Sequence, residues 1–208
     1  MKLFGKYLLA SLLLLSAAGS YAQTDGLIDR LYSRFSSSCV ELDYSYVTRM
    51  SGVRMEGQGL LQVQGDMWRN TGNGIEIWCD GKTVWTVDPV AEEVIIESVS
   101  PDTGDGLVNP VLMFIDMNEH FNVTKELSGN DGKTVIYVLE PKSDMGIEFF
   151  NVELLESDAS IRSGSFAMED GNEVKISVAS MKSVENKSAT FFRPSQKFDS
   201  SWIITDLR

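Results

Sequence analysis

The chain has 208 residues and a formal net charge of −12 at pH 7, with 18 Lys and Arg against 30 Asp and Glu. Two of the basic residues and none of the acidic ones lie in the first 22 positions, so residues 23–208 have a net charge of −14. Such a charge repels nucleic acid and anionic lipid headgroups, and no cluster of Lys and Arg offers a stripe for phosphates. Nucleic-acid binding is therefore excluded.

Residues 1–22 are typical of a cleavable secretory signal. Two lysines begin the segment, an apolar stretch continues to Ala18, and the small residues Ser20 and Ala22 suit signal peptidase. We expect cleavage between Ala22 and Gln23, export, and one domain over residues 23–208. The apolar stretch is shorter than the ~20 residues of a membrane-spanning helix, and no cysteine follows it, so neither an anchor nor a lipid at the cut is expected.

The elements of the exported domain begin with a helix, predicted over residues 24–38 because Leu27, Leu31 and Phe35 fall on one face. Strands follow, the first at 40–46, where apolar and polar residues alternate strictly. The other strands of this first series are predicted at 59–64, 67–71, 75–79, 82–87 and 93–99, and a Gly- and Asp-rich loop at 101–107 ends it.

A second helix, over 111–118 with Asn109-Pro110 at its start, separates this series from another. The second series is predicted at 121–127, 133–140, 146–155, 161–168, 173–181 and 190–192, and residues 202–204 are a candidate edge strand. We therefore expect a mainly β fold with a few helices. About eleven strands form a curved antiparallel sheet whose concave face the helices cover.

Residues that could carry catalysis are scarce. His120 is the only histidine, which removes most triads and most zinc sites, and neither Cys39 nor Cys79 belongs to a CxxC pair. A disulfide between these cysteines is open, since an exported domain meets an oxidising compartment. The Asp- and Gly-containing loops match no calcium-loop spacing. We expect no catalytic residue, no metal and no cofactor, and hence no enzyme.

One face of the predicted sheet is strongly apolar when read by strand alternation, and the second helix adds Leu and Met. This set is either an ordinary core or the lining of an apolar cavity, to which flexible Met and flat aromatic side chains are suited. Its members are Leu42, Tyr44, Tyr46, Leu61, Val63, Trp68, Ile75, Ile77, Trp85, Val87, Leu112, Met113, Phe114, Met117, Val174 and Ile176.

Several motifs in a fixed order resemble one family. Glu56-Gly57-Gln58-Gly59 leads to Trp68, and the segment 79–89 reads Cys-Asp-Gly-Lys-Thr-Val-Trp-Thr-Val-Asp-Pro. Segments 109–113, 137–142, 192–194 and 206–208 extend the match over essentially all of residues 23–208. Together they are similar to the outer-membrane lipoprotein carrier proteins, the LolA-like family.

The resemblance implies an incomplete β-barrel with helices as a lid over an apolar cavity. It also implies a monomeric periplasmic chaperone that takes acylated lipoproteins from an inner-membrane ABC transporter to the outer membrane, where a receptor accepts the cargo in many relatives. The alternative is a periplasmic lipid-binding or lipoprotein-sensing protein on the same fold.

The chain departs from the family pattern just before Trp68. Many relatives carry there a basic residue, linked to transfer, and a proline, whereas residues 63–67 contain neither. Arg69 is the candidate substitute. The tail is also short, so a receptor-docking extension of some relatives is not expected.

Energetics constrain any such carrier. Each acyl CH₂ removed from water contributes about 0.8 kcal/mol, so a sixteen-carbon chain fully shielded gains roughly 12 kcal/mol. Because a carrier that kept all of this gain could not release its cargo, we expect that the cavity without cargo is partly filled or closed, with helices that yield to cargo.

Overall fold

The computed structural model describes residues 25–99, 110–115, 117–144 and 146–208. The signal with its Ala22–Gln23 cut, the loop at 101–107 and the Asn109 cap lie outside these residues. The first half contains α1 (Asp25–Ser37), β1 (Cys39–Met50), β2 (Val53–Gln64), β3 (Met67–Gly72), β4 (Ile75–Cys79), β5 (Thr83–Asp88) and β6 (Glu93–Ser98). The second half contains η2 (Pro110–Phe114), α2 (Met117–His120), β7 (Phe121–Ser128), β8 (Thr134–Pro141), β9 (Ile147–Leu155), β10 (Ile161–Met168), β11 (Glu173–Val184), η3 (Ala189–Phe192) and β12 (Ile203–Asp206).

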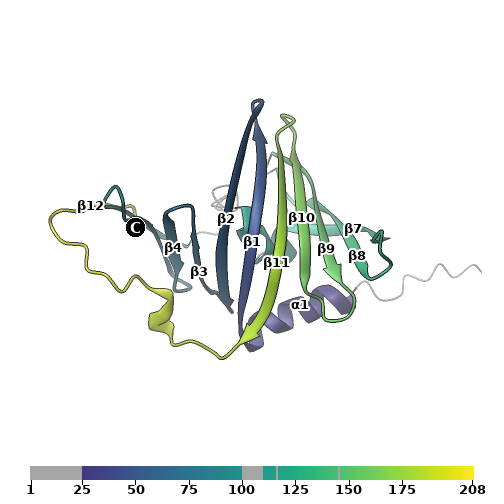
Figure 1. The fold of residues 1–208 in the computed structure, drawn as a ribbon, viewed down its shortest axis with the longest axis horizontal. Helices are drawn as coiled ribbons and strands as arrows, with labels where there is room; N and C mark the ends of the chain where they lie inside the picture. Colours follow the sequence, from purple (N-terminus) through teal and green to yellow (C-terminus); the bar gives the residue numbers. More distant parts are fainter. Residues whose placement is uncertain (1–24, 100–109, 116, 145) are drawn as a thin grey trace, which may run out of the picture.

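The described strands form one curved sheet of twelve in the order β12-β6-β5-β4-β3-β2-β1-β11-β10-β9-β8-β7 (Figure 1). Each series is an antiparallel meander, and the long strands β1 and β11 pair with each other and join the two series. The edge strands β12 and β7 do not meet, so the sheet is an incomplete barrel. The predicted fold class is therefore confirmed.

One strand prediction is wrong, the candidate edge strand is confirmed with an unexpected pairing, and one strand begins earlier than predicted. Residues 190–192 do not form a strand but lie in the 3-10 helix η3. The candidate strand near residue 203 does form, as β12, yet it pairs parallel with β6, whereas all other pairs in the described sheet are antiparallel. The strand β2 also starts at Val53, well before the predicted residue 59, and it forms with β1 a long hairpin closed by the two-residue turn Ser51-Gly52. Both turn residues have positive φ, 51° and 79°, which matches the twist of the flanking strands.

The main hydrophobic cluster lies between the concave face of the sheet and the helical segments α1, η2 and α2. Its largest fully buried side chains include Tyr137, Phe114, Phe150, Leu31 and Leu42. These residues come from both meanders and from the helical segments, so one core unites the chain. No helix in the described ranges is long and apolar enough to cross a membrane.

A smaller cluster lies on the opposite, convex face of the sheet. Trp78, Val87 and Val94 form it, and Phe198 and Trp202 of the tail pack over it. The tail leaves β11, passes the outer side of β3 and β4 and ends in β12 at the far edge of the sheet (Figure 1). It is fastened on the way by the Arg193–Asp80 ion pair of 2.7 Å.

Candidate functional site

The concave apolar face is the candidate site, and most of the predicted lining residues meet there. Twelve of the sixteen are buried in the main cluster, and Tyr46 and Ile75 pack against it. Leu42 and Leu61 pair directly across β1 and β2, which places their side chains on one face. The strand alternation in the sequence thus identified this face on β1 to β4 and on β11.

The prediction was wrong for Trp85 and Val87, which lie in the convex cluster instead. Cys79 of β4 faces the main cluster and pairs with Val84 of β5, so Val84 shares its face and Trp85 points the other way. The turn between the two strands sets this register, and a shift of one residue exchanges the two faces of a strand. Alternation within β5 alone could not reveal it.

Phe114 of η2 fills the space over the second meander. Its side chain is fully buried and lies 5.7 Å, between ring centroids, from Phe150 of β9. It also lies against Gly164 of β10, where a Cβ atom would come within 2.7 Å of the Phe114 ring. Gly164 is therefore a notch in the sheet that receives this ring.

Short polar links hold α2 in place. The backbone N–H of Asn118 donates to the Tyr32 hydroxyl of α1 at 2.9 Å, and Lys142 Nζ donates to the Asn118 carbonyl at 2.8 Å. Together with Phe114, these contacts close the main cluster with two segments of five and four residues.

Two arginines fasten α1 to the turn between β9 and β10. Arg30 donates to the Glu156 and Ser157 carbonyls, and Arg34 donates to the Asp158 carbonyl and to Ser160 Oγ at 2.8 Å. Burial would raise the pKa of Asp158, but hydrogen bonds from Ser160 and the nearby Arg34 guanidinium hold it below its ordinary value. α1 is thus held by polar contacts at its rim, while its inner side is apolar.

A polar strip crosses the apolar face on β1, β2 and β3. The Tyr44 hydroxyl donates to Asn70 Oδ1 at 2.9 Å, and Asn73 Nδ2 donates to the Tyr46 hydroxyl at 3.0 Å. Asn70 is only 3% exposed. Thr48, on the same face of β1, has a buried hydroxyl without a hydrogen-bond partner among the described residues. These groups interrupt the otherwise apolar face.

Arg69 lies on the convex face, not on the apolar one. Its guanidinium stacks on the Trp78 ring, 3.9 Å from the centroid, and forms a 3.5 Å ion pair with Glu76. The adjacent Trp68 points into the main cluster, because successive side chains of a strand face opposite ways. A role for Arg69 in cargo transfer stays a prediction.

Sequence reasoning missed the aromatic part of the site on the second meander. Phe150, Phe166 and Phe121 pack on one another there, with the Phe150 ring centroid 5.5 Å from that of Phe121 and 6.1 Å from that of Phe166. Burial, with Glu126 and Glu156 nearby, raises the pKa of Tyr137 to about 12, so this hydroxyl stays neutral. The alternation Phe150, Val152, Leu154 in β9 is a signal that could have identified this region.

Comparisons with known proteins agree with this architecture. Residues 68–195 match the family model described as outer membrane lipoprotein carrier protein LolA. No curated protein matches the sequence.

Solved structures are similar to this chain at low sequence identity. An uncharacterized conserved protein from Thermus thermophilus aligns with a TM-score of 0.57 and 13% identity, over 86% of this chain and 96% of its own. A DUF1329 family protein from Desulfovibrio piger has a TM-score of 0.47 and 10% identity, over 81% of this chain and 95% of its own. A LolA superfamily protein from Nitrosomonas europaea has a TM-score of 0.45 and 10% identity, over 81% of this chain and 96% of its own.

Proposed function

Because the chain belongs to the family of the outer membrane lipoprotein carrier protein LolA, we propose that it is a periplasmic chaperone for lipoproteins. It binds their acyl chains against the concave apolar face and carries them from the inner to the outer membrane. The signal at residues 1–22 is removed after Ala22, and residues 23–208 form the single carrier domain. An inner-membrane ABC transporter supplies the cargo, and an outer-membrane receptor is the candidate acceptor.

One observation carries the proposal: beside α1, the cover of the large apolar cluster consists of two very short helical segments. Among the described residues, η2 and α2 are five and four residues long, and they cover side chains from both meanders. Helices of this length have little stability of their own, so their position depends on packing. Moving Phe114 out of the Gly164 notch frees apolar surface without unpairing any strand.

Replacement of the Phe114 ring by an acyl chain also explains how the cargo can be released. An acyl chain that displaces Phe114 gains contact with the sheet but loses the packing of that ring, which costs energy. The net affinity is therefore smaller than the full transfer energy of the acyl chain. A closed, filled site of this kind suits a protein that must both bind and release.

Two measurements test the carrier function. Mass spectrometry of the protein isolated from the periplasm is expected to find bound acylated polypeptide. Depletion of the protein is expected to leave lipoproteins in the inner membrane. Normal sorting in depleted cells would refute the carrier function, and bound free lipid without polypeptide would favour the lipid-binding alternative.

A further inference from the structure

The β1–β2 hairpin ends in an exposed apolar tip. Met50, Val53 and Met55 are 39%, 59% and 48% exposed. Met50 pairs with Val53 and Thr48 pairs with Met55, so the three apolar side chains share the concave face of the hairpin. The hairpin rises beside the β10–β11 hairpin at one end of the molecule, away from α1 (Figure 1). Three clustered apolar side chains at such an end are available to a partner.

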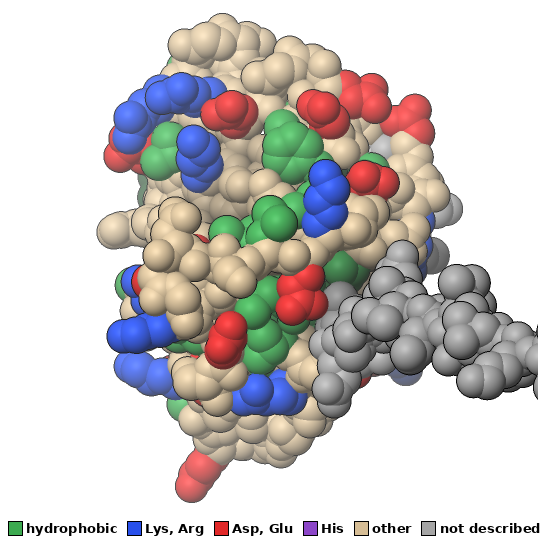
Figure 2. All heavy atoms as spheres, turned by 90° about the vertical axis from the view of Figure 1, so that its right-hand side faces the viewer, with side chains coloured by type: hydrophobic (Ala, Val, Ile, Leu, Met, Phe, Trp, Pro, Cys, Tyr) green, Lys and Arg blue, Asp and Glu red, His purple; other side chains and the backbone are tan. Residues whose placement is uncertain are grey.

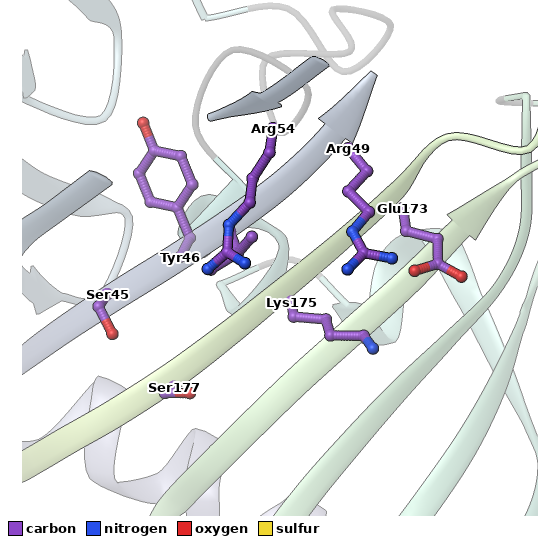
Figure 3. Close-up of a pocket in the computed structure, with 8 residues that line it drawn as sticks. Ser45, Tyr46, Arg49, Arg54, Glu173, Lys175 and Ser177 are labelled. Carbon is purple, nitrogen blue, oxygen red and sulfur yellow. The ribbon is translucent and has the colours of Figure 1, made fainter. Parts of the chain in front are cut away.

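The convex face of the same hairpin holds a basic pocket of about 280 Å³ (Figure 3). It is lined by Ser45, Tyr46, Val47, Arg49, Arg54, Glu173, Lys175 and Ser177. Figure 3 shows the side chains of Arg49, Arg54 and Lys175 gathered from three neighbouring strands. A water molecule occupies roughly 30 Å³ in the liquid, so a phosphate group fits this volume.

The cations of this pocket are only partly neutralised. Arg54 pairs with Glu56 at 2.5 Å, whereas neither Arg49 nor Lys175 has an ion pair within 4.0 Å in the described part of the chain. Glu173 is opposite Arg49 in the β1–β11 register. The pocket itself thus contains three cations and one carboxylate, in a chain of net charge −12. Hydroxyls of Ser45 and Ser177 add neutral donors for an oxyanion.

Besides Glu173 in the pocket, a further carboxylate lies in the neighbouring hairpin turn. The Ser51 backbone N–H donates to Asn172 Oδ1 at 2.8 Å, which ties the two tips together. Asn172 in turn donates to both carboxylate oxygens of Asp170, so this carboxylate belongs to the turn that is tied to the β1–β2 tip. A phosphate site with carboxylates nearby is complementary to a zwitterionic headgroup, in which an ammonium group follows the phosphate.

We propose that the β1–β2 tip is a membrane-contacting element that binds zwitterionic phospholipid. The basic pocket takes the headgroup phosphate, and Met50, Val53 and Met55 enter the interfacial region of the bilayer. The overall negative charge opposes binding to strongly anionic surfaces, so the zwitterionic surface is the preferred one. This contact goes beyond cargo carriage, because it defines which end of the molecule meets a membrane.

Sedimentation with vesicles of phosphatidylcholine and phosphatidylethanolamine tests the proposal on the cargo-free protein. The M50S/V53S/M55S variant is expected to reduce the bound fraction at least tenfold, and the R49Q/K175Q variant is expected to do the same. A matched control, V90S/V123S/L127S, replaces three other exposed apolar residues, which are 88%, 39% and 50% exposed. Seen from the β7–β8 side, hydrophobic side chains form small patches separated by charged ones (Figure 2). The control residues lie next to β6 and on β7, towards the two ends of the sheet, whereas the pocket lies on β1, β2 and β11 in its middle. The control is therefore expected to bind within twofold of the unmodified protein.

Three results would overturn the proposal. The first is that the unmodified protein does not bind the vesicles. The second is that the control variant loses as much of its bound fraction as the tip variant. The third is that binding appears only with phosphatidylglycerol and vanishes at high salt. A dimer that the M50S/V53S/M55S variant abolishes would assign the tip to a second copy instead. Unchanged far-UV circular dichroism and melting temperature of each variant exclude misfolding as the cause. The assay contains no lipoprotein, so its outcome is independent of the carrier function.

Discussion

Two glycines in β2 allow two tyrosine rings to lie flat across that strand. Tyr44 and Tyr46 of β1 stack with ring centroids 6.3 Å apart and reach over Gly59 and Gly57. A side chain at either glycine would occupy the space of a ring. The Glu56-Gly57-Gln58-Gly59 motif, which carries the family resemblance, therefore has a structural role, since it makes room for the polar strip of the site.

At the residue scale, Gly59→Ala is expected to lower the free energy of unfolding by about 1–3 kcal/mol, the usual cost of overpacking. The new Cβ atom would lie 2.7 Å from the Thr71 carbonyl oxygen and 2.8 Å from the Tyr44 hydroxyl. Urea denaturation measures the effect. Gly26→Ala in α1 is the control: no atom lies within 4 Å of its added Cβ, so no loss is expected. Equal stability of the two variants would contradict the packing argument.

Asp80 and Arg193 provide a second prediction at this scale. Burial would raise the pKa of Asp80, but the N–H groups of Thr83 and Lys82 and the Arg193 guanidinium hold it below its ordinary value. A carboxylate whose pKa is lower in the folded state stabilises the fold at neutral pH, and this contribution is lost as the pH falls below about 4.

Arg193→Gln is therefore expected to lower the free energy of unfolding by about 0.5–1 kcal/mol at pH 7, since the arginine is half exposed. The difference from the unmodified protein should shrink as the pH falls from about 4 to about 2. Denaturation curves across this range measure it. Arg208→Gln, which removes an exposed local pair with Asp206, is the control and should have no measurable effect.

At the scale of elements, the lid segments η2 and α2 are held by a few buried apolar side chains, among them Phe114 and Met117, and by two polar links. Phe114 enters the Gly164 notch, and the Asn118 N–H bonds to Tyr32. The strands beneath pair through long ladders, for example eleven residue pairs between β1 and β2. Displacing η2 and α2 while the sheet stays paired therefore requires less free energy than separating the strands.

Gly164→Ala is expected to destabilise the protein by about 1–3 kcal/mol and to increase binding of a fluorescent fatty acid, because it pushes Phe114 out of the notch. Phe114→Ala removes the ring and is expected to cost about 3–5 kcal/mol. The double variant should be only slightly less stable than the Phe114→Ala variant, because without the ring the added methyl group meets no clash. Additive effects would show that the two positions do not interact.

At the scale of the whole molecule, one side of a curved sheet is buried under a small lid and the other is fastened by the tail. Phe198 and Trp202 cover the convex cluster, and β12 pairs with β6 at the sheet edge. The two faces are therefore covered differently: the tail packs on the convex one near this edge, and helical segments cover the concave one.

Hydrogen exchange tests this division. On addition of a diacylated lipopeptide, amides of η2 and α2, including Asn118, are expected to exchange faster, while those of β1 and β11 keep their protection. The reason is that cargo displaces the lid but leaves the strand ladders paired. Faster exchange throughout the sheet would instead indicate general loosening, and no change anywhere would contradict the displacement of the lid.

Local patterns predicted most strands, because alternation and turn residues are properties of short segments. Alternation also identified Leu42, Leu61 and Ile176 as inward-facing. It could not relate one strand to the next, and Trp85 was therefore assigned to the wrong face. The parallel pairing of β12 with β6 escaped prediction for the same reason, and residues 190–192 were wrongly predicted to form a strand.

The sequence by itself determined the β-rich fold, the hairpin turns and the family, since these depend on residue types at short spacing. Only the tertiary structure decided which apolar residues share the concave face, that Phe114 occupies a notch at Gly164, and that Arg69 stacks on the convex side. Those outcomes depend on strand register and on contacts between distant segments. Register is set by turn geometry and by the packing of the whole core, which no single segment encodes.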